Sequence, residues 1–157
     1  MVVLSVWENQ MKIMLSILID SNILLDVMAT RQPCFETSSK VIETLKDKDI
    51  TVYVSASSVT DIYYIARREL KDKELVIQLI KDILKFIKIA TVSEDEINKA
   101  LELEWSDFED AVQYSTALLS QMDYIITRNA KDFKASEVLA ISPEDFFALL
   151  EPEDSET

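Results

Sequence analysis

The sequence feature that most constrains the fold is a short apolar run that ends at an acid, Ile17-Leu18-Ile19-Asp20. Three consecutive aliphatic residues are typical of a strand buried on both faces, as in parallel sheets covered by helices. Asp20 then lies where the strand gives way to a helix, which in open α/β sheets is the edge that forms the active-site crevice. The carboxylate has two interpretations. It caps the following helix, since Asp is a preferred N-cap residue, or it binds a metal ion.

The rest of the chain alternates between strand and helix patterns. Further strands are predicted at 51–54, 87–92, 124–126 and 138–141, with amphipathic helices between them. This alternation predicts an α/β fold with a central, mainly parallel sheet of about five strands. In the helix expected at 75–86, the predicted buried stripe consists of Leu75, Leu79, Ile83 and Phe86. We expect an N-terminal extension at 1–16, one domain at 17–150 and an acidic disordered tail at 151–157.

The composition excludes several kinds of chemistry. The chain has no histidine, which rules out Ser-His-Asp and Cys-His catalysis and the usual zinc ligand. It has no glycine, which rules out the glycine-rich phosphate loop and the dinucleotide fingerprint. Carboxylate, hydroxyl and amide oxygens remain, and these hard ligands suit Mg²⁺ or Mn²⁺.

The charge balance limits how the chain can bind nucleic acid. A net charge of −13 argues against non-specific binding, which depends on Lys and Arg neutralising phosphates. A nucleic-acid role therefore needs a local basic patch, a bridging cation or a basic partner. The densest basic cluster is Arg67-Arg68-Glu69-Leu70-Lys71 at the end of a predicted helix. Cations there complement the helix dipole, which is the simpler interpretation, or they guide a polyanion.

The cellular context follows from cysteine use and hydropathy. Cys34 is the only cysteine, so the chain forms no internal disulfide, and a reducing cytoplasm fits. No apolar run reaches the roughly 18 residues that a membrane span needs. We expect a cytoplasmic protein without a membrane partner.

Four aspartates stand out as candidate site residues: Asp20, Asp61, Asp110 and Asp132. Taken singly, Asp61 and Asp110 are explained by the positive ends of their helices, and Asp107 is a candidate N-cap. Taken together, three of the four aspartates lie at element junctions, where α/β enzymes build their sites. Carboxylates that converge there repel one another by about 2–4 kcal/mol per close pair, which a cation or a shared proton relieves.

Four segments of the chain resemble PIN-domain proteins, and most closely the VapC-like bacterial branch that includes the toxins of toxin–antitoxin pairs. They are residues 18–26 (LIDSNILLD), 55–64 (SASSVTDIYY), 107–113 (DFEDAVQ) and 126–133 (ITRNAKDF).

The resemblance implies an α/β/α sandwich and a ribonuclease that depends on Mg²⁺ or Mn²⁺. Asp20 matches the first metal-binding acid of the family, Asp110 the third, and Asp132 or Asn129 the fourth, while Asp61 stands where many members have glutamate. We expect four further polar residues to support the carboxylates: Asn22, Asp107, Thr127 and Asn129. We expect three basic residues to guide the RNA: Arg67, Arg128 and Lys131.

Three hypotheses about function follow. The first is a metal-dependent endoribonuclease that hydrolyses RNA, as the toxin of a toxin–antitoxin pair restrained by an antitoxin protein. The second is a catalytically weak PIN-like module that acts through a protein partner. The third is a metal-dependent phosphatase of another α/β class. Such enzymes need a second aspartate two residues after the first, and this chain has none two residues after Asp20. An apolar helix is the expected contact of a homodimer.

Overall fold

The computed structural model describes residues 15–47, 49–134 and 137–151. The strands in this part of the chain are β1 (Leu15–Ile19), β2 (Ile50–Ser55), β3 (Ile87–Ala90), β4 (Tyr124–Ile126) and β5 (Leu139–Ile141). The helices are α2 (Ser21–Met28), α3 (Phe35–Leu45), α4 (Ala56–Leu70), α5 (Lys73–Ile83), α6 (Glu94–Leu103), α7 (Phe108–Leu119) and α8 (Pro143–Leu150), with a short 3₁₀ helix, η1 (Ala130–Asp132). All five predicted strands are present, and the α/β prediction is confirmed.

The five strands form one parallel sheet in the order β3-β2-β1-β4-β5. The central position of β1 explains its continuous apolar sequence, because both of its faces are covered. The chain first builds outward from β1 through β2 to β3 and then crosses to β4 on the other side. The strand order therefore reverses at β1 and β4, and ligands of such sheets bind beyond the carboxyl ends of the strands at this point.

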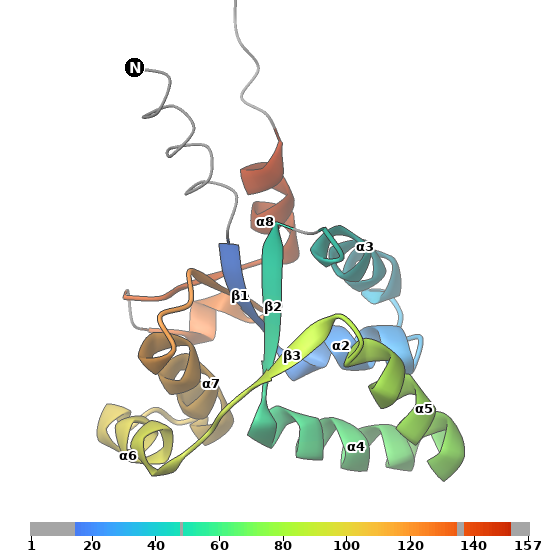
Figure 1. Cartoon of the computed structure of the whole chain (residues 1–157), viewed down its shortest axis with the longest axis horizontal. Helices are drawn as coiled ribbons and strands as arrows, with labels where there is room; N and C mark the ends of the chain where they lie inside the picture. Colours follow the sequence, from blue (N-terminus) through green and yellow to red (C-terminus); the bar gives the residue numbers. More distant parts are fainter. Residues whose placement is uncertain (1–14, 48, 135–136, 152–157) are drawn as a thin grey trace, which may run out of the picture.

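Helices cover the sheet on two sides (Figure 1), α2 to α5 on one and α6 and α7 on the other. The alternation of side chains along β1 divides the core accordingly. Ile17 and Ile19 pack into the larger core under α2 to α5, whereas Leu18 packs into a second core with Tyr114 of α7. These strand side chains are fully buried, so β1 links the two layers.

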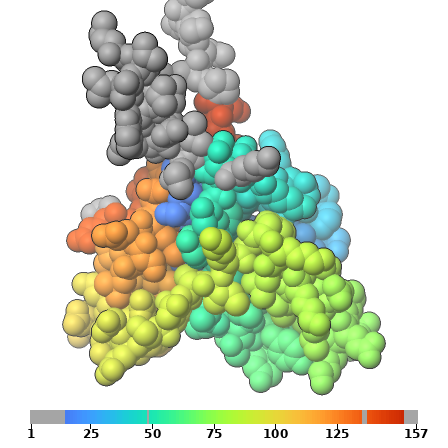
Figure 2. Space-filling model, viewed as in Figure 1, coloured from blue at the N-terminus to red at the C-terminus, as the bar shows by residue number. Residues whose placement is uncertain are grey.

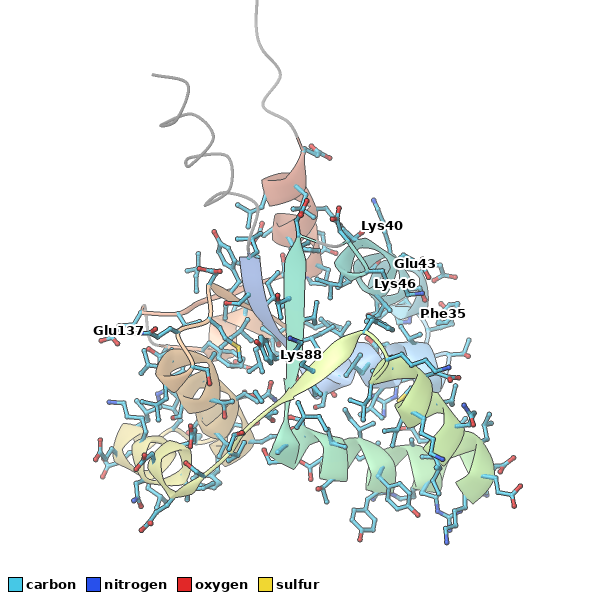
Figure 3. The ribbon with its side chains drawn as sticks, viewed as in Figure 1. Phe35, Lys40, Glu43, Lys46, Lys88 and Glu137 are labelled. Carbon is cyan, nitrogen blue, oxygen red and sulfur yellow. The ribbon has the colours of Figure 1, made fainter. Side chains whose placement is uncertain are left out.

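The last helix, α8, closes the larger core next to α3. Phe146 is buried in that core, and the ammonium group of Lys40 on α3 lies 4.3 Å from the ring centroid of Phe147. Figure 3 shows Lys40, Glu43 and Lys46 along the outer side of α3, away from the sheet. The amphipathic pattern of this helix is therefore confirmed, with Val41 buried beneath.

One detail of the predicted core is wrong. Leu75, expected on the buried stripe of α5, is 44% exposed, and Val76 is fully buried in its place. The helix begins at Lys73 after the N-cap Asp72, whose side chain accepts the backbone N–H of Leu75. The helix therefore begins two residues before the expected start, and its inner face buries Val76, with Leu79 and Ile83 packed against the same core.

The ends of the chain are only partly described. Strand β1 begins at Leu15, so Leu15 and Ser16 of the expected extension belong to the sheet. The rest of that extension, 1–14, and the end of the expected acidic tail, 152–157, lie outside the described residues. Among the described helices, none combines the length and apolar character needed to cross a bilayer.

The position of β1 between two cores makes a stability prediction. Replacing Leu18, which is 0% exposed, with alanine leaves a cavity beside Tyr114. We expect Leu18→Ala to lower the free energy of unfolding by about 2–5 kcal/mol, measured by urea denaturation. Leu139→Ala is the matched control, because Leu139 is 54% exposed in β5, and we expect a loss below about 1 kcal/mol. Equal losses in the two variants would contradict the assigned core.

Candidate active site

The candidate site is centred on Asp20, directly after β1. Its backbone N–H donates to the carbonyl of Ile126 at the end of β4, over 3.0 Å. Its side chain is the N-cap of α2 and accepts the backbone N–H of Asn22 over 3.3 Å. The capping interpretation is therefore confirmed. The cap occupies one position on Oδ1 and leaves Oδ2 free for other partners.

Three further donors converge on the Asp20 carboxylate from different segments. The hydroxyl of Thr127 donates to Oδ2 over 2.7 Å, and the side-chain amide of Gln113 donates to Oδ1 over 3.2 Å. The Ser21 hydroxyl lies 3.3 Å from Oδ1. Asp20 is only 2% exposed, so these donors replace water around a buried carboxylate. They fix its position between β1, β4 and α7.

The start of α7 brings a second group of acids to this edge. The Asp107 side chain caps the helix and accepts the backbone N–H of Asp110 over 3.1 Å. Burial, together with the negative charges of Asp107 and Asp20, raises the pKa of Asp110 from its ordinary 3.8 to about 7, and burial is the largest of these causes. Glu109 and Asp132 add to this repulsion.

Glu109 connects this group to Asp20 and Asp61. The Ser21 hydroxyl lies 3.2 Å from Glu109 Oε1, so it bridges the carboxylates of Asp20 and Glu109. Burial raises the pKa of Glu109, and among the neighbouring charges Asp61 of α4 adds most to this effect. The site therefore gathers six acids from four segments: Asp20, Asp61, Asp107, Glu109, Asp110 and Asp132.

These acids shift one another's pKa values, yet their side chains do not form a complete coordination shell for an ion. Within the described ranges, no three acidic side chains stand close enough to hold an ion as they are placed. The donor set itself fits a hard divalent cation, because it consists of carboxylates whose repulsion a cation relieves. In space-filling view the lower edge of the molecule, toward which the strands run, is indented between α6 and the lobe of α4 and α5 (Figure 2).

The predicted supporting residues have different placements. Thr127 contacts Asp20 with its side chain, while Asn22 and Asn129 contribute backbone N–H groups, the latter donating to Thr127 Oγ1 over 3.1 Å. Lys131 and Asp132 are exposed in η1, beside these residues.

The predicted RNA-guiding arginines are not gathered at the acids. Arg128 Nε lies 3.0 Å from Oδ2 of the buried Asp26, on the α3 side of the loop. Arg67 lies in the last turn of α4, in a surface hollow that it shares with Tyr63, Arg68 and Lys71. Six residues, or about 9 Å of helix, separate Arg67 from Asp61 along α4.

Sequence reasoning missed the roles of Gln113 and Glu109. Gln113 follows Asp110 by three residues and therefore shares its helix face. The polar amide one helix turn after Asp110 is the available signal, and in the structure its side chain is buried. Glu109 follows Ser106 by three residues, a spacing typical of a capping box, and only its contact with Ser21, 88 positions away, shows its second role.

Comparison with known proteins identifies the family to which this fold belongs. A family model described as PIN domain matches residues 16–131. Ribonuclease VapC1 of Aquifex aeolicus is 24% identical over 135 residues, covering 83% of this chain and 92% of that protein.

Solved structures share the fold at lower identity. VapBC2 from Rickettsia felis, bound to a promoter DNA fragment, has a TM-score of 0.66 at 16% identity and covers 82% of this chain and 98% of that one. A toxin-antitoxin complex from Klebsiella pneumoniae has a TM-score of 0.61 at 22% identity, covering 80% and 96%. VapC20 of Mycobacterium tuberculosis, described as a sarcin-ricin loop cleaving toxin, has a TM-score of 0.62 at 14% identity, covering 78% and 98%.

The raised pKa of Asp110 predicts how stability depends on pH in metal-free protein. The folded state binds this proton more tightly than the unfolded chain, so its stabilising contribution is lost as pH rises through about 7. We expect the melting temperature of chelator-treated wild type to fall from about pH 5.5 to about pH 8, and to fall less in Asp110→Asn.

Asp145→Asn is the control for this measurement. Asp145 holds the same position after the N-cap in α8 as Asp110 holds in α7, but it is exposed. We expect this variant to keep the wild-type slope. Parallel slopes in wild type and Asp110→Asn would show that Asp110 does not titrate in this range.

Proposed function

This chain belongs to the PIN-domain family, and from that premise we propose that it is an endoribonuclease that hydrolyses RNA with the help of Mg²⁺ or Mn²⁺. The observation that carries the proposal is the convergence of acids from four segments around the buried carboxylate of Asp20. The relative from Aquifex aeolicus, which is named a ribonuclease, supports the same reaction class.

We assign the cation to Asp20, Asp110 and Asp132, with Asp61 reaching the site through its neighbour Glu109. A divalent cation bound there activates water and stabilises the charge that develops on a phosphodiester. The protein supplies the positions of its ligands. Thr127 and Gln113 fix the Asp20 carboxylate, and Asp107 fixes the first turn of α7 that carries Asp110.

The proposed roles also explain the two raised pKa values. Below about pH 7 a metal-free Asp110 carries a proton, which reduces the repulsion among the acids. With a cation held by Asp20, Asp110 and Asp132, the Asp110 carboxylate would stay ionised, because the positive charge would offset the repulsion. Glu109 and Asp20 share the Ser21 hydroxyl as a hydrogen-bond donor, so a change in the charge of Asp20 also changes the hydrogen bonding of Glu109.

A protein partner is the second part of the proposal. The solved relatives include a structure described as a toxin-antitoxin complex, and VapBC2 was solved with promoter DNA. We propose that an antitoxin protein restrains this chain. A basic segment suits such a partner, because the chain carries a net charge of −13.

The cleavage proposal is tested with Asp20→Asn. Asn is as good an N-cap as Asp, so α2 keeps its cap while the ligand charge is lost. We expect the rate of RNA cleavage with Mg²⁺ to fall by more than about a hundredfold, since even indirect metal contacts are worth about 10–100-fold. Asp145→Asn is expected to cleave at the wild-type rate. If wild type and Asp20→Asn cleave alike, the activity does not come from this site.

Metal binding has a separate test that needs no activity. Mn²⁺ that binds only the folded state raises stability by RT ln(1 + [L]/Kd), about 2.7 kcal/mol at a hundredfold excess over Kd. We expect added Mn²⁺ to raise the melting temperature of wild type and to have much less effect on Asp110→Asn. No shift in wild type at about millimolar Mn²⁺ would favour the alternative of a binding module without metal chemistry.

A further inference from the structure

A second pocket lies beside the acids, and the proposed function does not use it. Its volume is about 360 Å³, within the range of small-ligand sites. Three segments form it: the start of α3, the loop after β4 and the start of α8. Its lining residues are Pro33, Cys34, Thr37, Ser38, Arg128, Asn129, Ser142, Pro143 and Glu144.

The guanidinium of Arg128 is held in the wall of this pocket by a buried carboxylate. Its Nε lies 3.0 Å from Oδ2 of Asp26, and its Nη1 lies 3.5 Å from the sulfur of Cys34. Asp26 is 1% exposed and also accepts the hydroxyl of Ser38 over 2.8 Å. The Arg128 side chain is nevertheless 34% exposed, so its remaining N–H groups can reach a ligand. Asp26 is therefore a positioning residue for Arg128.

The charge of the pocket disfavours a phosphate. Asp26 offsets the single cation, Arg128, and the carboxylate of Glu144 adds a negative charge to the lining. No second Lys or Arg is among the lining residues. A neutral ligand with both acceptors and donors matches this pair of opposite charges better than an anion does.

Guanine offers the matching groups. Its O6 and N7 are neighbouring acceptors that arginine binds as a pair. Its N1–H and N2 amino groups are neighbouring donors that suit the two oxygens of a carboxylate. None of the other three RNA bases carries both pairs, and unstacked RNA bases are commonly recognised through these edges.

We propose that this pocket binds a guanine base of the RNA next to the cleaved bond, with Arg128 on O6 and N7 and Glu144 on N1 and N2. The inference rests on the proposed function, since it makes cleavage selective for sequence. Arg128 directly follows Thr127, whose hydroxyl holds Asp20, so their Cα atoms are about 3.8 Å apart. Consecutive residues of one loop therefore contact the Asp20 carboxylate and line the pocket.

Cleavage of modified RNA tests the assignment of Glu144. Inosine lacks only the N2 amino group of guanosine. On an oligouridine that carries one of these nucleosides, we expect wild type to prefer guanosine by about fivefold to a hundredfold in kcat/KM. Glu144→Gln is expected to lose this preference, whereas Asp145→Asn, one residue further in the same helix turn, keeps it. Equal values for the two RNAs with wild type, or an unchanged preference in Glu144→Gln, would overturn the proposal.

A binding measurement separates the pocket from catalysis. We expect Asp20→Asn protein, titrated by calorimetry, to bind guanosine 5′-monophosphate at least about fivefold more tightly than inosine 5′-monophosphate, and to lose the difference when Glu144→Gln is added. If wild type cleaves no RNA but this selectivity is seen, the proposed function fails and the base pocket stands. If wild type cleaves RNA without selectivity for either nucleotide, the pocket assignment alone is wrong.

Discussion

The arrangement of the molecule depends on one buried carboxylate at the end of its central strand. Asp20 is almost inaccessible to water, and an unpartnered charge in such a place costs several kcal/mol. The protein meets this cost with hydrogen bonds from α2, from Thr127 after β4 and from Gln113 on α7. The same bonds that satisfy Asp20 therefore bring three separate segments to one edge, and α7 carries the remaining acids with it.

This arrangement concentrates negative charge where the fold gains nothing from it. Asp107, Glu109 and Asp110 lie together at the start of α7, and burial of Asp110 together with the charges around it raises its pKa to about 7. The positive end of α7 offsets part of the repulsion, but one helix dipole contributes only about 0.3–1 kcal/mol at a surface. Perturbed carboxylates that gather at a strand-order reversal mark a functional site better than a stabilising feature.

The sequence was sufficient for the strands and for their alternation with helices, because these depend on local patterns. The run before Asp20 predicted a strand buried on both faces, which the structure places at the centre of the sheet. Contacts between segments that are far apart in the sequence could not be predicted from these local patterns. The buried face of α5 depends on its packing against the larger core, which covers Val76 instead of Leu75. The pairing of Arg128 with Asp26 joins residues about a hundred positions apart, and no local pattern indicates it.

The placement of Arg128 changes how an acidic protein can select RNA. A chain with a net charge of −13 repels a polyanion, so contacts to phosphates alone would bind RNA weakly. The one arginine in the loop beside the acids is largely neutralised by Asp26, which removes it as a general phosphate ligand. A fixed guanidinium keeps its directional donors after its charge is offset, and base edges are recognised by direction more than by charge. In the proposed nuclease, selectivity comes from hydrogen bonds to bases, and a cation among the carboxylates would reduce the repulsion that the RNA backbone meets.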